Sequence, residues 1–546
     1  MGDGVRRGRV SRRAVLRWGA GAAAVAGAAA CEGGGTAQPS QPATSPTPAP
    51  TAPATPAPTP PPTATVSPSP ATPADWSALA AGVDGTVVLP GDARYPAASR
   101  LYQPQFDSLH PAGVVYPAGA QDVVECLAFA RRFGVPVALR SGGHSYAGWS
   151  SGPGMVLDVG RLDAVRASGG TAVVGAGARL IDVYAGLAAT GATVPAGTCP
   201  SVGVTGLTLG GGLGVTCRAY GLTCDSLTAA EVVAADGRVL RVDAGSEPEL
   251  FWALRGGGGG NFGVVTSLEF RTHPAADCAY GFLTWRWSQA AAVLRAWQAW
   301  APGAPDALWS SLHLDAWPDG RLEVSATVNL LGSKGELSDL IDRLGVAPAS
   351  ASLHAASYLE TMRVMGGVAG RSQAQAHLPG DLPGQAPQGR LSRVSYAARS
   401  DFFTRALDGG GTAALLAAVE GYARAVPDGG SAGVALDALG GAVNRVGAGD
   451  TAFVHRGALF LAQYIANFPS GSGGGPGPDQ SRAWLDGVWS AMRPSAGGGA
   501  YLNYTDPRLE GWEQAYYGAN AARLRQVKRA YDPQGLFHFP QSVPAG

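Results

Sequence analysis

Residues 197–214, GTCPSVGVTGLTLGGGLG, constrain the fold more than any other part of the chain. Seven of these eighteen residues are glycine. The interior of a helix or strand does not tolerate this composition, because each glycine costs about 1 kcal/mol relative to alanine. The segment is therefore predicted to be a loop with a bare backbone that lies against a flat or charged group.

Two further segments have the same character. Residues 140–145, RSGGHS, follow the predicted strand 135–139 directly, and Arg255 is followed by five glycines and Asn261-Phe-Gly263. Backbone N–H groups in such turns can approach an anionic group closely. None of the segments matches the GxGxxG pattern of nicotinamide-binding Rossmann domains, and the chain has no GKS or GKT. The glycines therefore favour a different phosphate-bearing cofactor and exclude a P-loop NTPase.

Composition excludes other classes of function. Six of the 40 Lys and Arg lie in the first 31 residues, with one of the 40 acidic residues, so the rest of the chain holds 34 basic and 39 acidic residues. No basic run remains to neutralise phosphates, which excludes a basic nucleic-acid-binding protein. Six scattered Cys without a CxxC pair exclude a disulfide scaffold, and we expect no metal site.

Residues 1–31 have the pattern of an export signal: a basic start, a short apolar stretch and small residues. Arg12-Arg13 is similar to a twin-arginine signal, which exports folded proteins. The apolar stretch is too short to span a bilayer. Cys31 is either the acceptor of a lipid anchor or a bystander of ordinary cleavage. We expect an exported protein, extracellular or anchored to a membrane only through a lipid on Cys31.

Residues 32–74 are predicted to be a disordered linker. They hold 14 of the 41 prolines and almost no large apolar side chain, so burial cannot offset their chain entropy. Folding is expected to begin near Asp75.

Three folded stretches follow. In residues 75–275 short strands alternate with helices such as Gln121–Phe133, whose apolar residues share one face. In residues 276–495 long strands lie between helices, which predicts an antiparallel sheet backed by helices. Residues 496–546 are predicted to hold a strand at Tyr501–Asn503, a helix and a tail. The strands expected in the first two stretches are 135–139, 155–159, 172–175, 231–235, 239–242, 308–315, 322–331, 394–399, 434–446 and 458–467.

Seven motifs together resemble the berberine-bridge-enzyme-like FAD-linked oxidases of the vanillyl-alcohol-oxidase superfamily. They occur in the family's order: RSGGHS, GTCPSVGVTGLTLGGGLG, RAYGLTCD, FWALRGGGGGNFGVVT, HR…FLAQY, YLNYTD and YDPQGLFHFPQSV. The resemblance implies an α+β fold with a PCMH-type FAD-binding domain, split between residues 75–275 and 496–546. It also implies a substrate domain, 276–495, whose sheet covers the flavin.

The resemblance implies a covalent FAD. His144 stands where the family's histidine bonds to the flavin 8α-methyl group, and a neutral imidazole can attack that electrophilic carbon. Cys199 stands where bicovalent members bond flavin C6; the alternative for Cys199 is a free thiol. The other residues expected to contact the cofactor lie in the glycine-rich motifs: Arg140, Ser141, Gly142, Gly143, Ser145, Gly197, Thr198, Val202, Gly203, Gly206, Gly210, Gly211, Gly212, Gly214, Gly263 and Val264. Val202 also matches the family's oxygen gatekeeper, where Val is typical of oxidases and Leu of dehydrogenases.

On the substrate side, strand alternation places Gln463 and Tyr464 on opposite faces of the predicted strand 458–467. Gln463 matches a family active-site position. Tyr501 and Asn503 are expected to share one face of a strand. A phenol with a lowered pKa near the flavin could take an alcohol proton as hydride leaves to N5, so Tyr501, Gln463 and Asn503 are the catalytic candidates. Arg445 stands where the alkaloid ring-closing member has a catalytic Glu, which argues against ring closure.

These motifs predict an exported FAD-dependent oxidase that takes hydride from an alcohol or sugar hemiacetal and reduces O₂ to hydrogen peroxide. One alternative keeps the flavin and oxidises a C–N bond of an amine or alkaloid-like compound. Another is a surface lipoprotein that binds a ligand without catalysis, which would leave His144, Cys199 and the glycine segments unexplained.

Overall fold

The computed structural model describes residues 69–425, 430–468 and 478–546. The export signal, Cys31 and residues 32–68 of the expected linker lie outside the described residues. The first described helix, α2 (Pro73–Gly82), begins two residues before the expected start of folding, because Thr72 caps it and exchanges hydrogen bonds with Asp75.

The first half of the described chain contains two sheets. A four-stranded sheet has the order β1 (Thr86–Val88), β2 (Gly113–Tyr116), β4 (Met155–Asp158), β3 (Val137–Arg140), and α4 (Ala120–Phe133) follows β2. A five-stranded antiparallel sheet has the order β5 (Val165–Ser168), β6 (Thr171–Gly175), β10 (Val264–Arg271), β8 (Leu227–Val233), β9 (Val239–Asp243). The predicted alternation of helices and strands in this region is confirmed, with ends shifted by a few residues.

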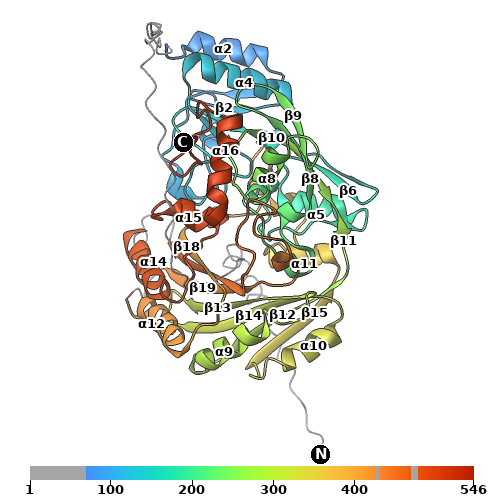
Figure 1. Cartoon of the computed structure of the whole chain (residues 1–546), viewed down its shortest axis with the longest axis vertical. Coiled ribbons are helices and arrows are strands. Elements are labelled where there is room, and N and C mark those ends of the chain that lie inside the picture. The colour runs from blue at the N-terminus through green and yellow to red at the C-terminus, as the bar shows by residue number, and fades with distance from the viewer. Residues whose placement is uncertain (1–68, 426–429, 469–477) are drawn as a thin grey trace, which may run out of the picture.

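The second half is built on one seven-stranded antiparallel sheet. Its order is β15 (Ser350–Ala356), β12 (Cys278–Trp285), β14 (Leu322–Leu331), β13 (Leu308–Ala316), β19 (Ser431–Ala438), β20 (Phe460–Phe468), β18 (Ser395–Phe403). Four helices cover one face: α9 (Ala290–Trp300), α10 (Lys334–Asp342), α12 (Gly409–Ala425) and α14 (Pro478–Met492) (Figure 1). The other face is turned toward the first half, which confirms the α+β fold with a sheet backed by helices.

One predicted strand is too long, and another is absent. The strand expected at 434–446 ends at Ala438, because Gly440 and Gly441 adopt positive φ angles of 94° and 56° that break the extended backbone, and α13 (Ala442–Arg445) follows. The strand expected at Tyr501–Asn503 is instead a 3₁₀ turn, Leu502–Tyr504, entered from an extended Tyr501.

The C-terminal segment returns to the first half of the chain. Figure 1 shows α16 (Ala521–Tyr531) beside α8 (Pro248–Leu254), with α15 (Trp512–Tyr517) next to α16. Lys528 of α16 is buried; its Nζ donates to the Asn261 and Phe537 carbonyl oxygens at 2.8 and 2.7 Å and pairs with Asp532 at 2.7 Å. The return of this segment supports a split first domain, and we propose boundaries near residues 275 and 495.

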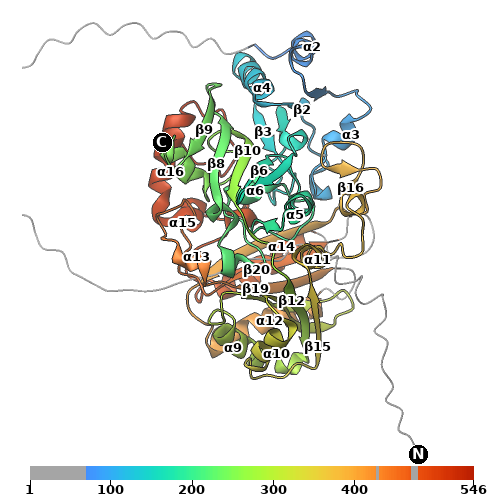
Figure 2. The same cartoon turned by 90° about the vertical axis from the view of Figure 1, so that its right-hand side faces the viewer.

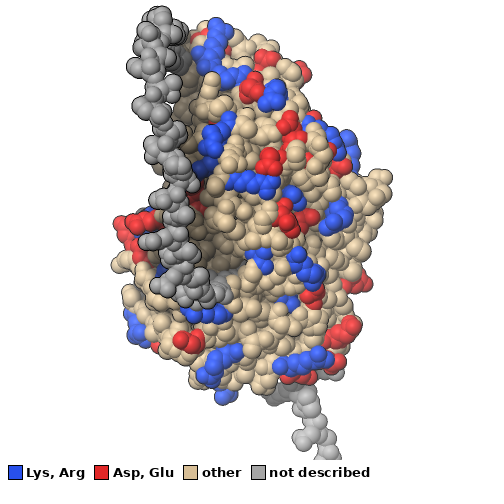
Figure 3. Space-filling model, viewed as in Figure 1, with Lys and Arg blue, Asp and Glu red and all other residues tan. Residues whose placement is uncertain are grey.

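On the face in Figure 3, basic and acidic side chains are interspersed. Within the described ranges, no helix is long and apolar enough to cross a bilayer, and no group of three or more His, Cys, Asp or Glu is placed to hold a metal ion.

Candidate functional site

A cavity of about 460 Å³ lies where the glycine-rich segments meet. The predicted cofactor and catalytic residues that line it are Arg140, Ser141, Gly142, Gly143, His144, Ser145, Gly197, Thr198, Cys199, Val202, Gly203, Gly206, Gly263, Tyr501 and Asn503. They come from turns more than 350 residues apart in the sequence, after β3, before and within α6 (Val204–Leu209), before β10 and after α14. The structure therefore brings together most of the residues that the motifs single out.

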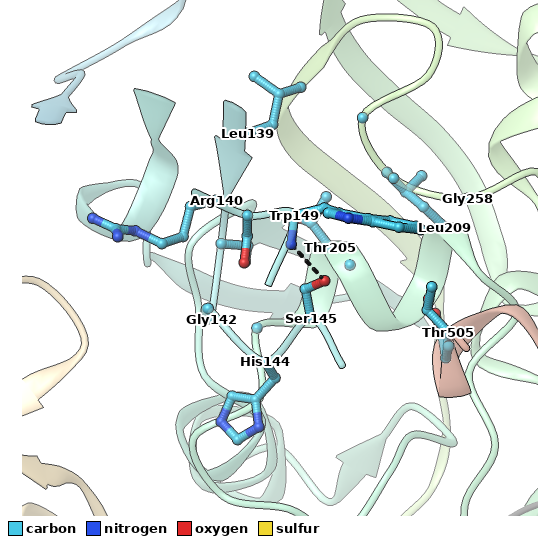
Figure 4. A pocket seen from close by; sticks show the side chains of 18 of the residues that line it. Leu139, Arg140, Gly142, His144, Ser145, Trp149, Thr205, Leu209, Gly258 and Thr505 are labelled. Atoms are coloured by element: carbon cyan, nitrogen blue, oxygen red, sulfur yellow. Dashed lines mark hydrogen bonds between the residues drawn. The ribbon is translucent and has the colours of Figure 1, made fainter. Parts of the chain in front are cut away.

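The turn after β3 is held against the loop before α6. A Cβ on Gly142 would stand 2.2 Å from the Gly203 backbone nitrogen, so the two backbones are in direct contact. Ser145 Oγ accepts a hydrogen bond from the Trp149 N–H at 3.1 Å, which closes the turn on its other side (Figure 4). His144 is thereby presented from a fixed turn and not from a free loop.

His144 lies in contact with the loop that carries Cys199. One ring nitrogen, Nε2, is 3.0 Å from Ser201 Oγ, and the ring stacks on Tyr102 with centroids 3.9 Å apart. The other nitrogen, Nδ1, has no hydrogen-bond partner among the described residues. Burial, followed by the positive charge of Arg179, lowers the pKa of His144 to about 3. The imidazole is therefore neutral at physiological pH and keeps a lone pair for bonding.

Cys199 belongs to the same wall of the cavity. Its carbonyl oxygen accepts from the Val202 N–H at 3.2 Å, which forms the turn that places Val202 at the cavity surface. Burial raises the pKa of the Cys199 thiol to about 12, so the thiol is protonated in the protein itself. The five cysteines of the described residues are all free.

Arg140 is turned away from the cavity. Its guanidinium bonds to Asp158 at 2.5 Å and to the Ala98 carbonyl oxygen at 2.6 Å, and Figure 4 shows it pointing away from His144. The pair is buried, with 4% and 7% of the two side chains exposed. Arg140 therefore fixes the start of the turn through its Nε and Nη2 atoms, while it also contributes to the cavity wall.

Six predicted site residues do not line the cavity: Gly210, Gly211, Gly212, Gly214, Val264 and Gln463. This corrects the prediction that the whole glycine loop faces the cofactor. A Cβ on Gly210 would stand 2.0 Å from Asn503 Oδ1, and one on Gly214 would stand 1.8 Å from the Ala196 carbonyl oxygen. These glycines allow close packing of the protein on itself. Val264 is the first residue of β10, where it is buried and pairs with Val233 of β8.

Tyr501 is buried at the cavity with its hydroxyl held by two donors. The phenol oxygen accepts from the Gly212 N–H at 3.1 Å and from Asn503 Nδ2 at 2.9 Å. The Asn503 amide also donates to the Leu207 carbonyl oxygen at 3.0 Å, so it ties Tyr501 to α6. Because both donors occupy the phenol lone pairs, the hydroxyl proton is free to point elsewhere.

The pKa of Tyr501 differs from the expectation. Burial raises it above its ordinary value, while the hydrogen bonds from Asn503 and Gly212 act in the opposite direction. The predicted lowered pKa is not found in the protein itself, because desolvation of the phenolate outweighs the two donors.

Gln463 does not line the cavity, but it contacts a lining residue, Tyr146, that was not among the predicted site residues. Its Nε2 donates to Tyr146 Oη at 3.0 Å, and Tyr146 lines the cavity. Tyr464 lies on the opposite face of β20, beside Asp401, as the alternation predicted. Tyr146 directly follows RSGGHS, so its place next to the motif was the available signal.

Arg445 is remote from the site. Its side chain is 62% exposed and pairs with Asp306 at 2.5 Å, and it does not line the cavity. The absence of a Glu at position 445 therefore carries no argument about ring closure, which corrects the sequence analysis.

The cavity fits a flat, phosphate-bearing cofactor such as the expected FAD. An ideal Cβ on Gly206 meets nothing within 4 Å, and one on Gly259 meets nothing closer than 3.8 Å, so bare backbone faces open space there. Four buried polar atoms of lining residues have no partner within the described chain: Arg140 Nη1, Ser150 Oγ, Ser151 Oγ and Gln541 Oε1. Buried polar groups of this kind require a partner, which a ligand can supply. Further lining residues that the predictions missed are Trp149, Gly258, Gly260, His538 and Phe539.

Comparisons with known proteins agree with this site. The sequence family described as FAD binding domain matches residues 111–243, and the family described as berberine and berberine like matches residues 500–544. An uncharacterized FAD-linked oxidoreductase of Bacillus subtilis, YgaK, is 34% identical over 445 residues, which cover 80% of this chain and 91% of the relative. A chitooligosaccharide oxidase of Gibberella zeae is 30% identical and is aligned over 79% of this chain and 87% of its own.

Solved structures give the same result. The fold is similar to BBE-like 1 of Physcomitrella patens, with a TM-score of 0.76 at 26% identity, covering 86% of this chain and 99% of that one. It is also similar to a xylooligosaccharide oxidase of Myceliophthora thermophila in complex with xylobiose, with a TM-score of 0.74 at 27% identity and the same coverage of both chains.

Proposed function

The chain belongs to the berberine-bridge-enzyme-like family of FAD-linked oxidoreductases, and from this premise we propose that it oxidises an alcohol or sugar hemiacetal with release of hydrogen peroxide. It is an FAD-linked oxidase in a family for which a covalent flavin is typical, which rules out the ligand-binding lipoprotein without catalysis. When bound, FAD accepts hydride from a substrate carbon and passes two electrons to dioxygen.

The observation that carries the choice of substrate is the chemistry of the cavity wall. None of the described residues that line the cavity is Asp or Glu. A protonated amine would therefore find no carboxylate partner, and burial of an unpaired cation is costly. The wall instead presents neutral hydroxyl and amide groups, among them Tyr146, Tyr501 and Asn503. Such groups suit a neutral, hydroxylated substrate.

In this proposal His144 and Cys199 hold the flavin and Tyr501 accepts the proton of the substrate hydroxyl. Asn503 and the Gly212 N–H stabilise the phenolate oxygen that accepts this proton, and Gln463 orients Tyr146 through its hydrogen bond. Two of the relatives are a chitooligosaccharide oxidase and a xylooligosaccharide oxidase by name, which supports a carbohydrate as the substrate.

The test is peroxide release from the purified protein with mono- and oligosaccharides and, separately, with aromatic amines. We expect peroxide with at least one carbohydrate and none with amines. Turnover of amines alone would replace the proposal by C–N oxidation with the same flavin.

Val202 controls the access of dioxygen in this account. It lines the cavity three residues after Cys199. We expect Val202→Leu to leave reduction by substrate unchanged and to slow reoxidation in air by about 10- to 200-fold, the scale of one methylene in a closed pocket. Stopped-flow absorbance measures both half-reactions, with Val202→Ala as the control that adds no bulk. Equal reoxidation of the Leu variant and the parent would exclude the gatekeeper role.

We also propose that the protein is exported through the twin-arginine-like signal in residues 1–31. A covalent flavin is attached to a folded protein, and this pathway carries folded proteins. Replacement of Arg12 and Arg13 by Lys should retain the protein inside the cell. Labelling with a fatty acid would decide whether Cys31 carries a lipid.

A further inference from the structure

A segment of the second half of the chain lies on the first half. Residues 366–393, here called the strap, connect α11 (Tyr358–Met365) to β18 and contain the short parallel pair β16 (Leu378–Pro379) and β17 (Gln385–Ala386). Figure 2 shows β16 beside α3 (Tyr95–Ala98) and α5 (Leu180–Ala188), away from the seven-stranded sheet. The proposed function gives the strap no role.

Polar contacts fasten the strap to α5. His377 Nε2 lies 2.8 Å from an Asp182 carboxylate oxygen, and Gln373 Nε2 donates to the other oxygen at 2.7 Å. Leu382, further along, packs against the apolar cluster that contains Val88 and Val156. The strap is therefore fixed at more than one point.

Between these points the strap covers Arg179. Arg179 Nη2 donates to the Pro383 carbonyl oxygen at 3.3 Å, and a Cβ on Gly384 would stand 2.2 to 2.3 Å from the guanidinium group. The side chain is 7% exposed. Gly384 is thus a position where the absence of a side chain makes room for Arg179.

On its other side Arg179 holds the turn that carries His144. Its Nη1 donates to the Ser141 carbonyl oxygen at 2.8 Å and to the Gly177 carbonyl oxygen at 2.7 Å. Ser141 belongs to the RSGGHS turn. A guanidinium that bonds two carbonyl oxygens in a fixed geometry restrains the turn more than a single donor would.

The charge of Arg179 acts on His144 directly. It is the second cause, after burial, of the lowered pKa of His144. Burial lowers the pKa of Arg179, whereas the carboxylates of Asp158 and Asp182 act in the opposite direction and favour the charged guanidinium. Arg179 therefore restrains the turn and also disfavours the imidazolium, which has no lone pair for bond formation.

We propose that Arg179, held by the strap, is a positioning residue for formation of the covalent link between His144 and FAD. The inference rests on the proposed link at His144 and deepens it. Arg179 fixes the Ser141 end of the turn. The His144 ring therefore keeps the contact between its Nε2 and Ser201 Oγ and presents its Nδ1 to the cofactor.

The bond-forming step balances as follows. A bond forms between the imidazole nitrogen and the carbon of the 8α-methyl group, while that carbon and the imidazole each lose one proton. The two electrons released reach dioxygen, which takes up two protons and becomes hydrogen peroxide. Dioxygen, the oxidant of the proposed reaction, is the only co-reactant required.

The first test uses the full chain with Cys199→Ala, so that a link through His144 is the only link measured. Arg179→Gln and Arg179→Lys are compared with this parent for total bound flavin and for the rate at which bound flavin becomes acid-stable in air. We expect both variants to bind FAD. We expect a rate lower by about tenfold or more in the Gln variant, on the scale of a lost charge-assisted hydrogen bond, with partial rescue by Lys.

The second test reaches Arg179 through the strap. Gly384→Ala places a methyl group against the guanidinium, whereas Gly370→Ala, in the same strap, meets nothing within 4 Å. The two glycines have similar φ angles of +75° and +71°, so the backbone strain of the two substitutions is matched. Gly384→Ala should slow the formation of the link, and Gly370→Ala should not.

Three results would overturn the inference. One is an unchanged rate in Arg179→Gln and Gly384→Ala; another is an equal decrease in the two glycine variants. The third is loss of total flavin together with the link, which would make Arg179 a structural residue only. If the Cys199→Ala parent itself releases all its flavin in acid, the proposed link at His144 fails first, and this outcome is distinct from the others.

Discussion

Tyr501→Phe is expected to lower kcat by about 10²- to 10⁴-fold, the range that a positioned acid–base group contributes. The variant keeps the ring, and its contacts with Phe402 and Tyr504, but removes the oxygen that Asn503 and the Gly212 N–H hold. Reduction of the flavin by substrate, followed by stopped-flow absorbance, measures this step separately from reoxidation.

The matched control is Tyr517→Phe. Tyr517 is also buried, and its hydroxyl donates to the Gly257 carbonyl oxygen at 3.1 Å, but it does not line the cavity. The two variants lose a similar buried hydroxyl, so a purely structural effect would be similar in both. A rate of flavin reduction in Tyr501→Phe equal to that in Tyr517→Phe would remove Tyr501 from the reaction.

The pH dependence follows from the same residue. Burial raises the pKa of Tyr501, and a base must be deprotonated to act. The rate of flavin reduction should therefore increase with pH on the alkaline side, since the active phenolate becomes more populated. This increase should disappear in Tyr501→Phe. Its persistence in the variant would assign the titration to another group.

His144→Ala combined with Cys199→Ala is expected to abolish covalent attachment completely. The two residues lie on one wall of the cavity, and Ser201, which contacts the His144 ring, lies in the Cys199–Val202 turn. Each single variant should retain acid-stable flavin through the remaining residue. Flavin fluorescence on a denaturing gel measures the attachment, with Cys224→Ala as the control for a buried thiol outside the cavity.

Fluorescence of the double variant on the gel would contradict this assignment. A Cys199→Ala variant with the same flavin spectrum as the parent would show that the link is through His144 alone.

The sequence predicted the parts of the site that depend on local motifs. Runs of glycine disfavour regular structure, so the three glycine-rich segments could be located without knowledge of the fold. The prediction that all of residues 197–214 form a loop was wrong in part, because residues 204–209 form the short helix α6. His144 and Cys199 follow from the same motifs. The sequence could not show which glycines line the cofactor cavity and which allow close packing of the protein. Gly210 lies against Asn503 and Gly214 against Ala196, and only the folded chain brings these residues together.

Contacts between distant segments account for the remaining errors. Gln463 contacts the site only through Tyr146, which lies 317 residues earlier in the chain, and no local pattern indicates this contact. Arg445 was expected at the position of a catalytic Glu because of its place in a motif. In the structure Gly440 and Gly441 end the strand, and the Arg445 side chain pairs with Asp306. The raised pKa of Tyr501 in the protein itself could not be predicted, since the burial that causes it arises only in the folded chain.

An absorbance spectrum of the purified protein, recorded before and after acid precipitation, tests the central claim most directly. The account predicts a yellow protein whose flavin absorbance stays with the precipitate, because His144 and Cys199 bond the cofactor. Flavin that passes entirely into the supernatant, or a folded protein without flavin absorbance, would contradict it.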